Sequence, residues 1–163
     1  MNLAYWTLER WLLIAVYVIS AAALLKIHRT QPRKVQAVFL FQQCSSWILG
    51  LLVVEAGLLD YPIREFRVAT RTSFAFEFLV FPVIACYVNM YYPRQARPLL
   101  KFGYFAAYAS GGTILEYLIE KYTELITYTG WAWYWTFLSV MLSLGASRLF
   151  LVWFMDQGKS RVH

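Results

Sequence analysis

Five apolar stretches follow one another through this chain, each close to the roughly 20 residues that a helix needs to cross a membrane. They cover about residues 3–25, 35–59, 74–90, 99–119 and 131–155. Each stretch is expected to be helical, because lipid offers no hydrogen-bond partner to an open strand edge. The sequence therefore predicts an all-α integral membrane protein: one domain, residues 1–163, built as a bundle of five transmembrane helices.

Composition supports lipid as the solvent for most of the protein surface. Hydrophobic residues make up 60% of the chain and charged residues 15%, whereas soluble domains are about 45–50% apolar. The net charge of +6 comes from basic residues that cluster between the apolar stretches. This placement favours a role in orienting the chain in a membrane over nucleic-acid binding. Membrane lipids, and not nucleic acid, are the expected partners.

Basic residues fall unevenly on the two sides of the predicted bundle. One side carries nine: Lys26, Arg29, Arg33, Lys34, Arg94, Arg97, Lys101, Lys159 and Arg161. The other side carries five: Arg10, Arg64, Arg67, Arg71 and Lys121. Short loops rich in lysine and arginine stay on the cytoplasmic side. The chain is therefore predicted to place its N-terminus outside and its C-terminus in the cytoplasm.

Acidic residues concentrate at the outer ends of the predicted spans. Glu55, Glu77 and Glu116 belong to three different spans and are expected at similar depth, just beneath the outer interface. Glu120 follows Glu116 at i+4, on the same face of a helix. Charged side chains at this depth cost free energy and persist when they are paired or needed for function. Their convergence predicts a polar pocket that faces outward.

The segment DYPIREFRVATRTSF, residues 60–74, links the second and third spans. Asp60 is suited to cap a helix and Pro62 to its first turn. Three arginines then recur at i, i+3 and i+7, on one stripe of a helix: Arg64, Arg67 and Arg71. The pattern predicts a short interfacial helix that carries guanidinium groups above the acidic layer.

Aromatic residues follow the acidic ones in the fifth stretch. Trp131, Tyr134 and Trp135 suit an interfacial belt whatever the function. Together with carboxylates they also suit an organic cation, whereas arginines suit a phosphate head group. The charge of a ligand thus stays open. The predicted ligand-binding residues are Glu55, Glu77, Glu116, Glu120, Arg64, Arg67, Arg71, Trp131, Tyr134 and Trp135.

Three functions fit these residues. The main hypothesis is a non-enzymatic membrane protein whose pocket binds a lipid head group or small molecule, with transport as one consequence. The second is an intramembrane enzyme acting on a lipid or isoprenoid, with Glu116 as the general acid. The third is a purely structural membrane component, in which the arginines and carboxylates form a salt-bridged lid.

No metal site and no cofactor are expected. His28 lies in a basic loop and His163 ends the chain, so neither is available inside a span. Cys44 and Cys86 lie in apolar stretches without the spacing of a zinc site. The chain also lacks the usual hydrolase, metalloprotease and nucleotide-binding motifs.

Small and polar residues within the spans predict contacts between helices. The fourth stretch contains AAYASGG at residues 106–112, and the fifth has serines at i, i+4 and i+8: Ser139, Ser143 and Ser147. Such faces let helices approach closely and would support a homo-oligomer. Four polar residues lie near the middle of the second stretch: Gln42, Gln43, Ser45 and Ser46. Their amides should hydrogen-bond another helix or line a cavity.

The chain contains two segments with a distinctive pattern: GLLDYPIREFRVATRTSFAFEFLVFPVIACYVNMYYP (residues 57–93) and ILEYLIEKYTELITYTGWAWYWTF (residues 114–137). Together they resemble a family of small polytopic membrane proteins of spore-forming Firmicutes for which no biochemical activity is established. The similarity covers the chain from about Gln36 onward. It implies a bacterial cytoplasmic membrane and a role in sporulation, and it implies no catalytic residue.

Overall fold

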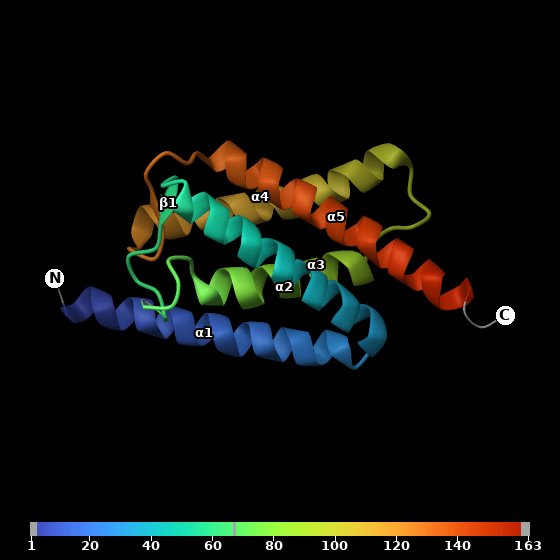
Figure 1. The fold of residues 1–163 in the computed structure, drawn as a ribbon, viewed down its shortest axis with the longest axis horizontal. Coiled ribbons are helices and arrows are strands. Elements are labelled where there is room, and N and C mark those ends of the chain that lie inside the picture. Colours follow the sequence, from blue (N-terminus) through green and yellow to red (C-terminus); the bar gives the residue numbers. More distant parts are fainter. Residues whose placement is uncertain (1–2, 67, 161–163) are drawn as a thin grey trace.

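The computed structural model describes residues 3–66 and 68–160, which contain five α-helices (Figure 1). In chain order the elements are α1 (Leu3–His28), α2 (Pro32–Glu55), the strand β1 (Leu59–Asp60), the π-helix η1 (Ala75–Val80), α3 (Phe81–Met90), α4 (Pro98–Tyr122), the strand β2 (Thr127–Tyr128) and α5 (Trp133–Ser160). η1 runs directly into α3, so the two form one helical rod. The prediction of an all-α fold is confirmed, with two short strands added.

Three helices of the described chain are long and apolar enough to cross a membrane. They include the segments Glu9–His28, Pro32–Glu55 and Trp133–Gln157. The η1–α3 rod, Ala75–Met90, is apolar but shorter. α4 has 25 residues but carries tyrosine, serine and glycine along its length. The chain is thus a membrane protein by the length and composition of its helices.

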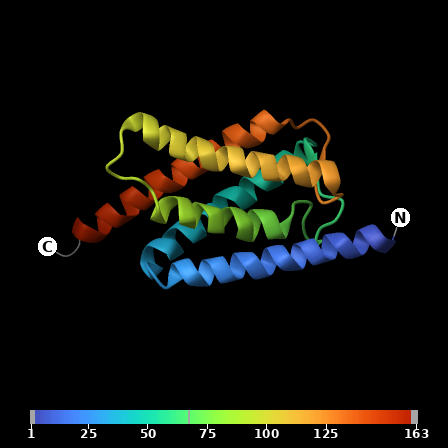
Figure 2. The ribbon, with the colours of Figure 1, turned by 180° about the vertical axis from the view of Figure 1, so that it is seen from behind.

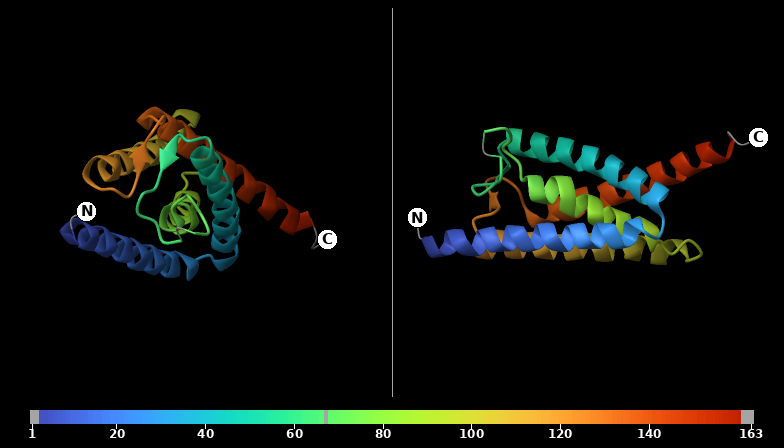
Figure 3. Two further views of the ribbon diagram at one scale, coloured as in Figure 1. Left: turned by 60° about the vertical axis from the view of Figure 1, so that its left-hand side comes forward. Right: turned by 90° about the horizontal axis from the view of Figure 1, so that it is seen from below.

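α3 is the central helix of the bundle. Viewed from one end it lies between the other four helices, and from behind it is flanked by α1 and α4 (Figures 2 and 3). Its side chains are buried around most of its circumference, including Val83, Ala85, Cys86 and Val88. Ala85, Cys86 and Val88 pack in one apolar core with Val38 of α2 and with residues of α5. The shortest helix is therefore shielded by protein on most sides.

The two strands join the two loops at one end of the bundle. β1 pairs with β2 in antiparallel register, Leu59 opposite Tyr128 and Asp60 opposite Thr127. Gly57 allows the turn out of α2, because its φ of 70° lies in the left-handed region that favours glycine. The pairing holds the segment after α2 beside the segment after α4. It therefore ties together parts of the chain that are distant in sequence.

The predicted interfacial helix in the second loop is wrong. The described residues between β1 and η1 form turns and bends, and Arg67 lies outside the described residues. Arg64 explains the difference, because its guanidinium donates hydrogen bonds to the carbonyls of Tyr61 at 2.7 Å and Thr70 at 2.8 Å. The segment folds around this side chain instead of forming a helical ladder. The second span also ends early, at Glu55, since residues 56–58 form a turn that leads into β1.

Candidate functional site

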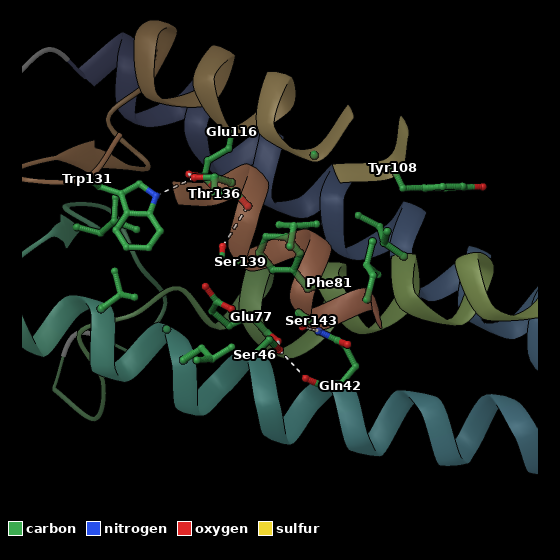
Figure 4. Close-up of a pocket in the computed structure, with 18 of the residues that line it drawn as sticks. Gln42, Ser46, Glu77, Phe81, Tyr108, Glu116, Trp131, Thr136, Ser139 and Ser143 are labelled. Carbon is green, nitrogen blue, oxygen red and sulfur yellow. Dashed lines mark hydrogen bonds between the residues drawn. The ribbon is translucent and has the colours of Figure 1, made fainter. Parts of the chain in front are cut away.

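A cavity of about 200 Å³ lies between α2, η1–α3, α4 and α5, toward the end of the bundle where the strands pair (Figure 4). Two carboxylates face it: Glu77 reaches in from η1 and Glu116 from α4. Aromatic walls come from Tyr61, Phe81 and Trp131. Hydroxyl and amide groups from α2 and α5 complete the polar lining: Gln42, Ser46, Thr136, Ser139 and Ser143.

The position of Glu77 follows from the proline one turn later. Pro82 has no N–H, so it cannot donate to the carbonyl of Phe78, as an α-helix requires, or to that of Glu77, as a π-helix requires. α2 supplies both missing donors. Gln43 Nε2 donates to the Phe78 carbonyl at 3.0 Å, and Ser46 Oγ donates to the Glu77 carbonyl at 2.5 Å. The irregular turn is thus satisfied by α2, and it fixes Glu77 against that helix.

Gly50 makes room for the Glu77 side chain. A Cβ atom at position 50 would lie 2.9 Å from Cδ of Glu77 and 3.0 Å from its Oε1. Such distances are shorter than van der Waals contact allows, so any larger residue would displace the carboxyl group. Glu77 itself is buried. The close approach of α2 to η1 therefore depends on this glycine.

Glu116 is held by a chain of hydrogen bonds. The indole Nε1–H of Trp131 donates to Thr136 Oγ1 at 2.7 Å, and the Thr136 hydroxyl donates to Glu116 Oε1 at 2.6 Å. The direction is fixed because an indole nitrogen can only donate. Tyr128 of β2 donates to the same oxygen at 2.8 Å. Three residues of the loop between α4 and α5 and of the first turn of α5 therefore orient this carboxylate.

Two tyrosines of the loops face the carboxylates. Burial, together with the nearby carboxylates of Glu77 and Glu116, raises the pKa of Tyr61 well above its ordinary value. Burial and the Glu116 carboxylate likewise raise the pKa of Tyr128. Both phenols stay protonated at neutral pH and act as hydrogen-bond donors. The hydroxyl oxygen of Tyr61 lies 3.5 Å from Glu77 Oε1, at the limit of a hydrogen bond.

The inner end of the cavity offers a spare acceptor. Gln42 Nε2 donates to Ser143 Oγ at 2.6 Å. Its other amide atom, Oε1, is buried and accepts no hydrogen bond from the described residues. This end can therefore accept a hydrogen bond from a bound molecule.

An apolar chamber adjoins the polar cavity. It has a volume of about 270 Å³ and lies between α1, η1–α3 and α4. Tyr61, Phe81 and Glu116 line both spaces. The other walls of the chamber are mainly aliphatic, such as those from Val16 and Ile119. Glu116 thus stands between a polar cavity and an apolar one.

Of the ten predicted site residues, the structure brings three to the cavity: Glu77, Glu116 and Trp131. Glu55 pairs with Arg71 at 3.8 Å, but both side chains are more than 70% exposed. Such exposed pairs add little stability. This is the one salt bridge among the residues that the structure describes.

The remaining predicted site residues that the structure describes are not part of the cavity wall. Arg64 holds the second loop, and Arg67 lies outside the described residues. Glu120 is not part of the cavity wall. Tyr134 and Trp135 are each 48% exposed on the outside of α5, as expected for an interfacial belt. Six of the ten predicted residues therefore lie outside the wall of this cavity.

Sequence reasoning missed Tyr61, Tyr128 and Thr136 as site residues. The tyrosines reach the site through the pairing of β1 with β2, for which the sequence shows no pattern. Thr136 carried a weak signal, as a polar residue beside tryptophans in an apolar stretch. The expectation that the amides of α2 would hydrogen-bond another helix or line a cavity is confirmed. Gln42 bonds Ser143 and lines the cavity, and Gln43 bonds the Phe78 carbonyl.

The serines of α5 divide between two roles. Ser147 is buried and accepts a hydrogen bond from Asn89 Nδ2 of α3 at 2.9 Å, which confirms a contact between helices. Ser139 and Ser143 face the cavity instead. Helical spacing alone does not distinguish these roles, because the cavity and the contact lie along one side of α5.

Comparison of this chain with protein-family models, curated proteins and solved structures found no match. The resemblance to a family of Firmicutes membrane proteins therefore stays a prediction. Function has to be inferred from the cavity itself.

Proposed function

We propose that this protein crosses the bacterial cytoplasmic membrane five times and binds, in its cavity, an amphipathic small molecule or lipid with a cationic head group. It has its N-terminus outside and its C-terminus in the cytoplasm, so that the cavity opens toward the outer side. Binding is its function in this proposal, and transport of the ligand is one consequence. No catalysis is required.

The five-span topology is supported by the lengths and positions of the two remaining helices. α4 has 25 residues, about 37 Å at 1.5 Å per residue. The η1–α3 rod, Ala75–Met90, is about 24 Å long. It needs less apolar surface toward lipid, because the other helices surround it (Figure 3). Both helices lie alongside the three that are long and apolar enough to cross a membrane.

The observation that carries the proposal is the charge of the cavity wall. Glu77 and Glu116 face one space, and no lysine or arginine is among the residues that line it. A phosphate or carboxylate ligand would be repelled there. An organic cation would favour the ionised form of these two acids and would also contact the ring faces of Tyr61 and Trp131. The apolar chamber beside Glu116 suits a hydrocarbon chain attached to such a head group.

The test compares three amphiphiles that share a ten-carbon chain and differ in head group: decyltrimethylammonium, decyl maltoside and decyl sulfate. The thermal midpoint of the purified protein is measured in maltoside detergent with each additive. We expect the cation alone to raise the midpoint. A ligand present at 100 times its dissociation constant stabilises a protein by about 2.7 kcal/mol.

Variants locate the effect at the cavity. Glu77→Gln and Glu116→Gln should abolish the stabilisation by decyltrimethylammonium. Glu120→Gln is the matched control, because Glu120 lies one turn beyond Glu116 on α4 and outside the cavity wall. The proposal would be overturned if Glu116→Gln and Glu120→Gln lost the stabilisation by decyltrimethylammonium equally. It would also be overturned if decyl sulfate raised the midpoint as much as the cation does.

An intramembrane enzyme is the second candidate, and one feature favours it. Glu116 stands at the border of the apolar chamber, where the chain of a lipid or isoprenoid would place a reacting group beside an acid. Mass spectra of lipids from cells that express the wild type or Glu116→Gln would decide. A product present only with the wild type would establish catalysis, and identical lipid profiles would contradict it.

A further inference from the structure

A second charged cavity lies at the opposite end of the bundle. It has a volume of about 260 Å³ and lies where the start of α2, the loop after α3 and the last turns of α5 meet. Three basic side chains line it, one from each segment: Lys34, Arg94 and Arg148. The first cavity carries two carboxylates and no cation, so the two ends of the bundle are opposite in charge.

The basic groups outnumber the acidic groups in the wall of this cavity. Arg94 is close enough to Arg148 for their charges to repel. Asp156 is the one acid in the cavity wall, and no salt bridge joins it to a basic residue in the described chain. Three cations gathered around one acid leave an excess of positive charge. An anion in the cavity would relieve the repulsion.

Two of the three basic groups are held in place. The Arg148 guanidinium lies 4.3 Å from the centroid of the Tyr92 ring, a cation–π contact. Tyr92 in turn packs against the rings of Tyr104 and Phe105 of α4. Lys34 Nζ donates to Gln31 Oε1 at 2.6 Å. Groups that are already positioned lose less entropy when they bind a ligand.

The wall beside these groups is apolar and borders the lipid-facing side of α5. Leu151, Val152 and Met155 line the cavity. On the same helix Leu149 and Trp153 are 74% and 58% exposed, as expected for side chains in contact with acyl chains. An anion that occupies this cavity therefore meets hydrocarbon on one side. This combination suits a phosphate that carries acyl chains better than a free ion.

We propose that this cavity binds the phosphate of an anionic membrane phospholipid, with Arg94, Arg148 and Lys34 around the phosphate and the acyl chains along α5. Guanidinium groups bind phosphate oxygens through paired, charge-assisted hydrogen bonds. Basic pockets between membrane helices recognise anionic head groups in this way. The site is independent of the cation-binding function proposed for the other cavity.

Native mass spectrometry of the full chain tests the site. The protein is released from mixed micelles that contain equal amounts of phosphatidylglycerol and phosphatidylcholine with the same acyl chains. We expect the wild type to retain phosphatidylglycerol preferentially. The double variant Lys34→Gln/Arg94→Gln should lose about tenfold or more of this retention, since charge-assisted hydrogen bonds are removed. Arg148 is left unchanged, so that its contact with the Tyr92 ring is kept in the variant.

The matched control is the double variant Arg29→Gln/Arg97→Gln. Both arginines are exposed in neighbouring loops at the same end and lie outside the cavity wall. The control has the same net charge as the test variant and should retain phosphatidylglycerol like the wild type. Equal loss in both variants would show general attraction to a basic surface and would overturn the proposal.

Inorganic phosphate distinguishes a lipid site from an anion site. If inorganic phosphate alone displaces phosphatidylglycerol at equimolar concentration, the cavity recognises a free anion and the lipid proposal is wrong. Unchanged retention in Lys34→Gln/Arg94→Gln would also overturn it. Neither result depends on Glu77 or Glu116, so the lipid-site proposal can be overturned while the proposal for the cation site stands, and the reverse.

Discussion

At the scale of single residues, the cavity depends on two close fits. Gly50 lets α2 approach η1, so that the Glu77 carboxyl group lies where a Cβ atom would collide with it. The Thr136 hydroxyl accepts a hydrogen bond from the Trp131 indole and donates one to Glu116. Neither residue is charged, yet each positions one of the two carboxylates.

Gly50→Ala should disable the cavity without unfolding the protein. The new methyl group displaces the flexible end of Glu77, while alanine favours the helix by about 0.5–1 kcal/mol over glycine. We expect an unchanged or slightly raised thermal midpoint without ligand and little stabilisation by decyltrimethylammonium. Gly103→Ala in α4 is the control, because an added Cβ meets nothing within 4 Å there. Equal responses of the two variants to the cation would contradict this role of Gly50.

Thr136→Val should lower the free energy of unfolding by about 1–3 kcal/mol, the usual cost of a buried polar group that loses its partner. The indole N–H of Trp131 loses its acceptor and Glu116 loses a donor. Thr113→Val is the matched control, since that buried hydroxyl bonds only to the Ala109 carbonyl of its own helix. Equilibrium unfolding in mixed detergent measures the change in the free energy of unfolding for both variants. A smaller effect at position 136 than at 113 would show that the chain of hydrogen bonds contributes little.

At the scale of elements, η1 and the strand pair decide which side chains meet. Pro82 interrupts the backbone hydrogen bonds of η1, and α2 completes them through Gln43 and Ser46. The pairing of β1 with β2 holds Tyr61 and Tyr128 beside the carboxylates. The helices build the walls of the cavity, and these irregular elements place its polar groups.

Pro82→Ala should weaken the cavity by restoring regular helix. Alanine supplies an N–H that competes with the donors from α2, so the turn before it relaxes toward α geometry and Glu77 rotates. We expect a clear loss of decyltrimethylammonium stabilisation. Pro98→Ala, at the exposed start of α4, removes an equivalent proline far from the cavity. A Pro82→Ala variant that binds the cation like Pro98→Ala would show that the π-helix is dispensable.

At the scale of the whole molecule, two cavities of opposite charge lie at opposite ends of one bundle. The carboxylates lie at the end with the strand pair, and the basic groups lie where α2 begins and α5 ends. Basic loops favour the cytoplasmic side of a membrane. In the proposed topology, the site for the cation therefore lies at the outer side and the site for the anionic lipid at the inner side.

Cysteine labelling in intact cells tests this orientation. In a background of Cys44→Ala and Cys86→Ala, Glu124→Cys should react with an impermeant thiol reagent and Arg29→Cys should be protected. Arg29 lies in the turn after α1 and Glu124 in the loop after α4, at opposite ends of the bundle. Permeabilised cells, in which both positions should react, provide the control. The reverse pattern would invert the topology and place the carboxylate cavity on the cytoplasmic side.

A helical chain suited to lipid could be predicted from the sequence, because the length and polarity of a stretch are properties of its own residues. The sequence also indicated that acids from different spans lie at one end. The packing of the helices brings Glu77 and Glu116 to one cavity and leaves Glu55 and Glu120 outside it, which the sequence did not predict. Depth along a helix can be counted from residue numbers, whereas the direction of a side chain around the helix depends on the neighbouring helices and on the π-turn at η1. The second loop also took its shape from tertiary contacts, since the hydrogen bonds of Arg64 and the pairing of β1 with β2 replaced the predicted helix.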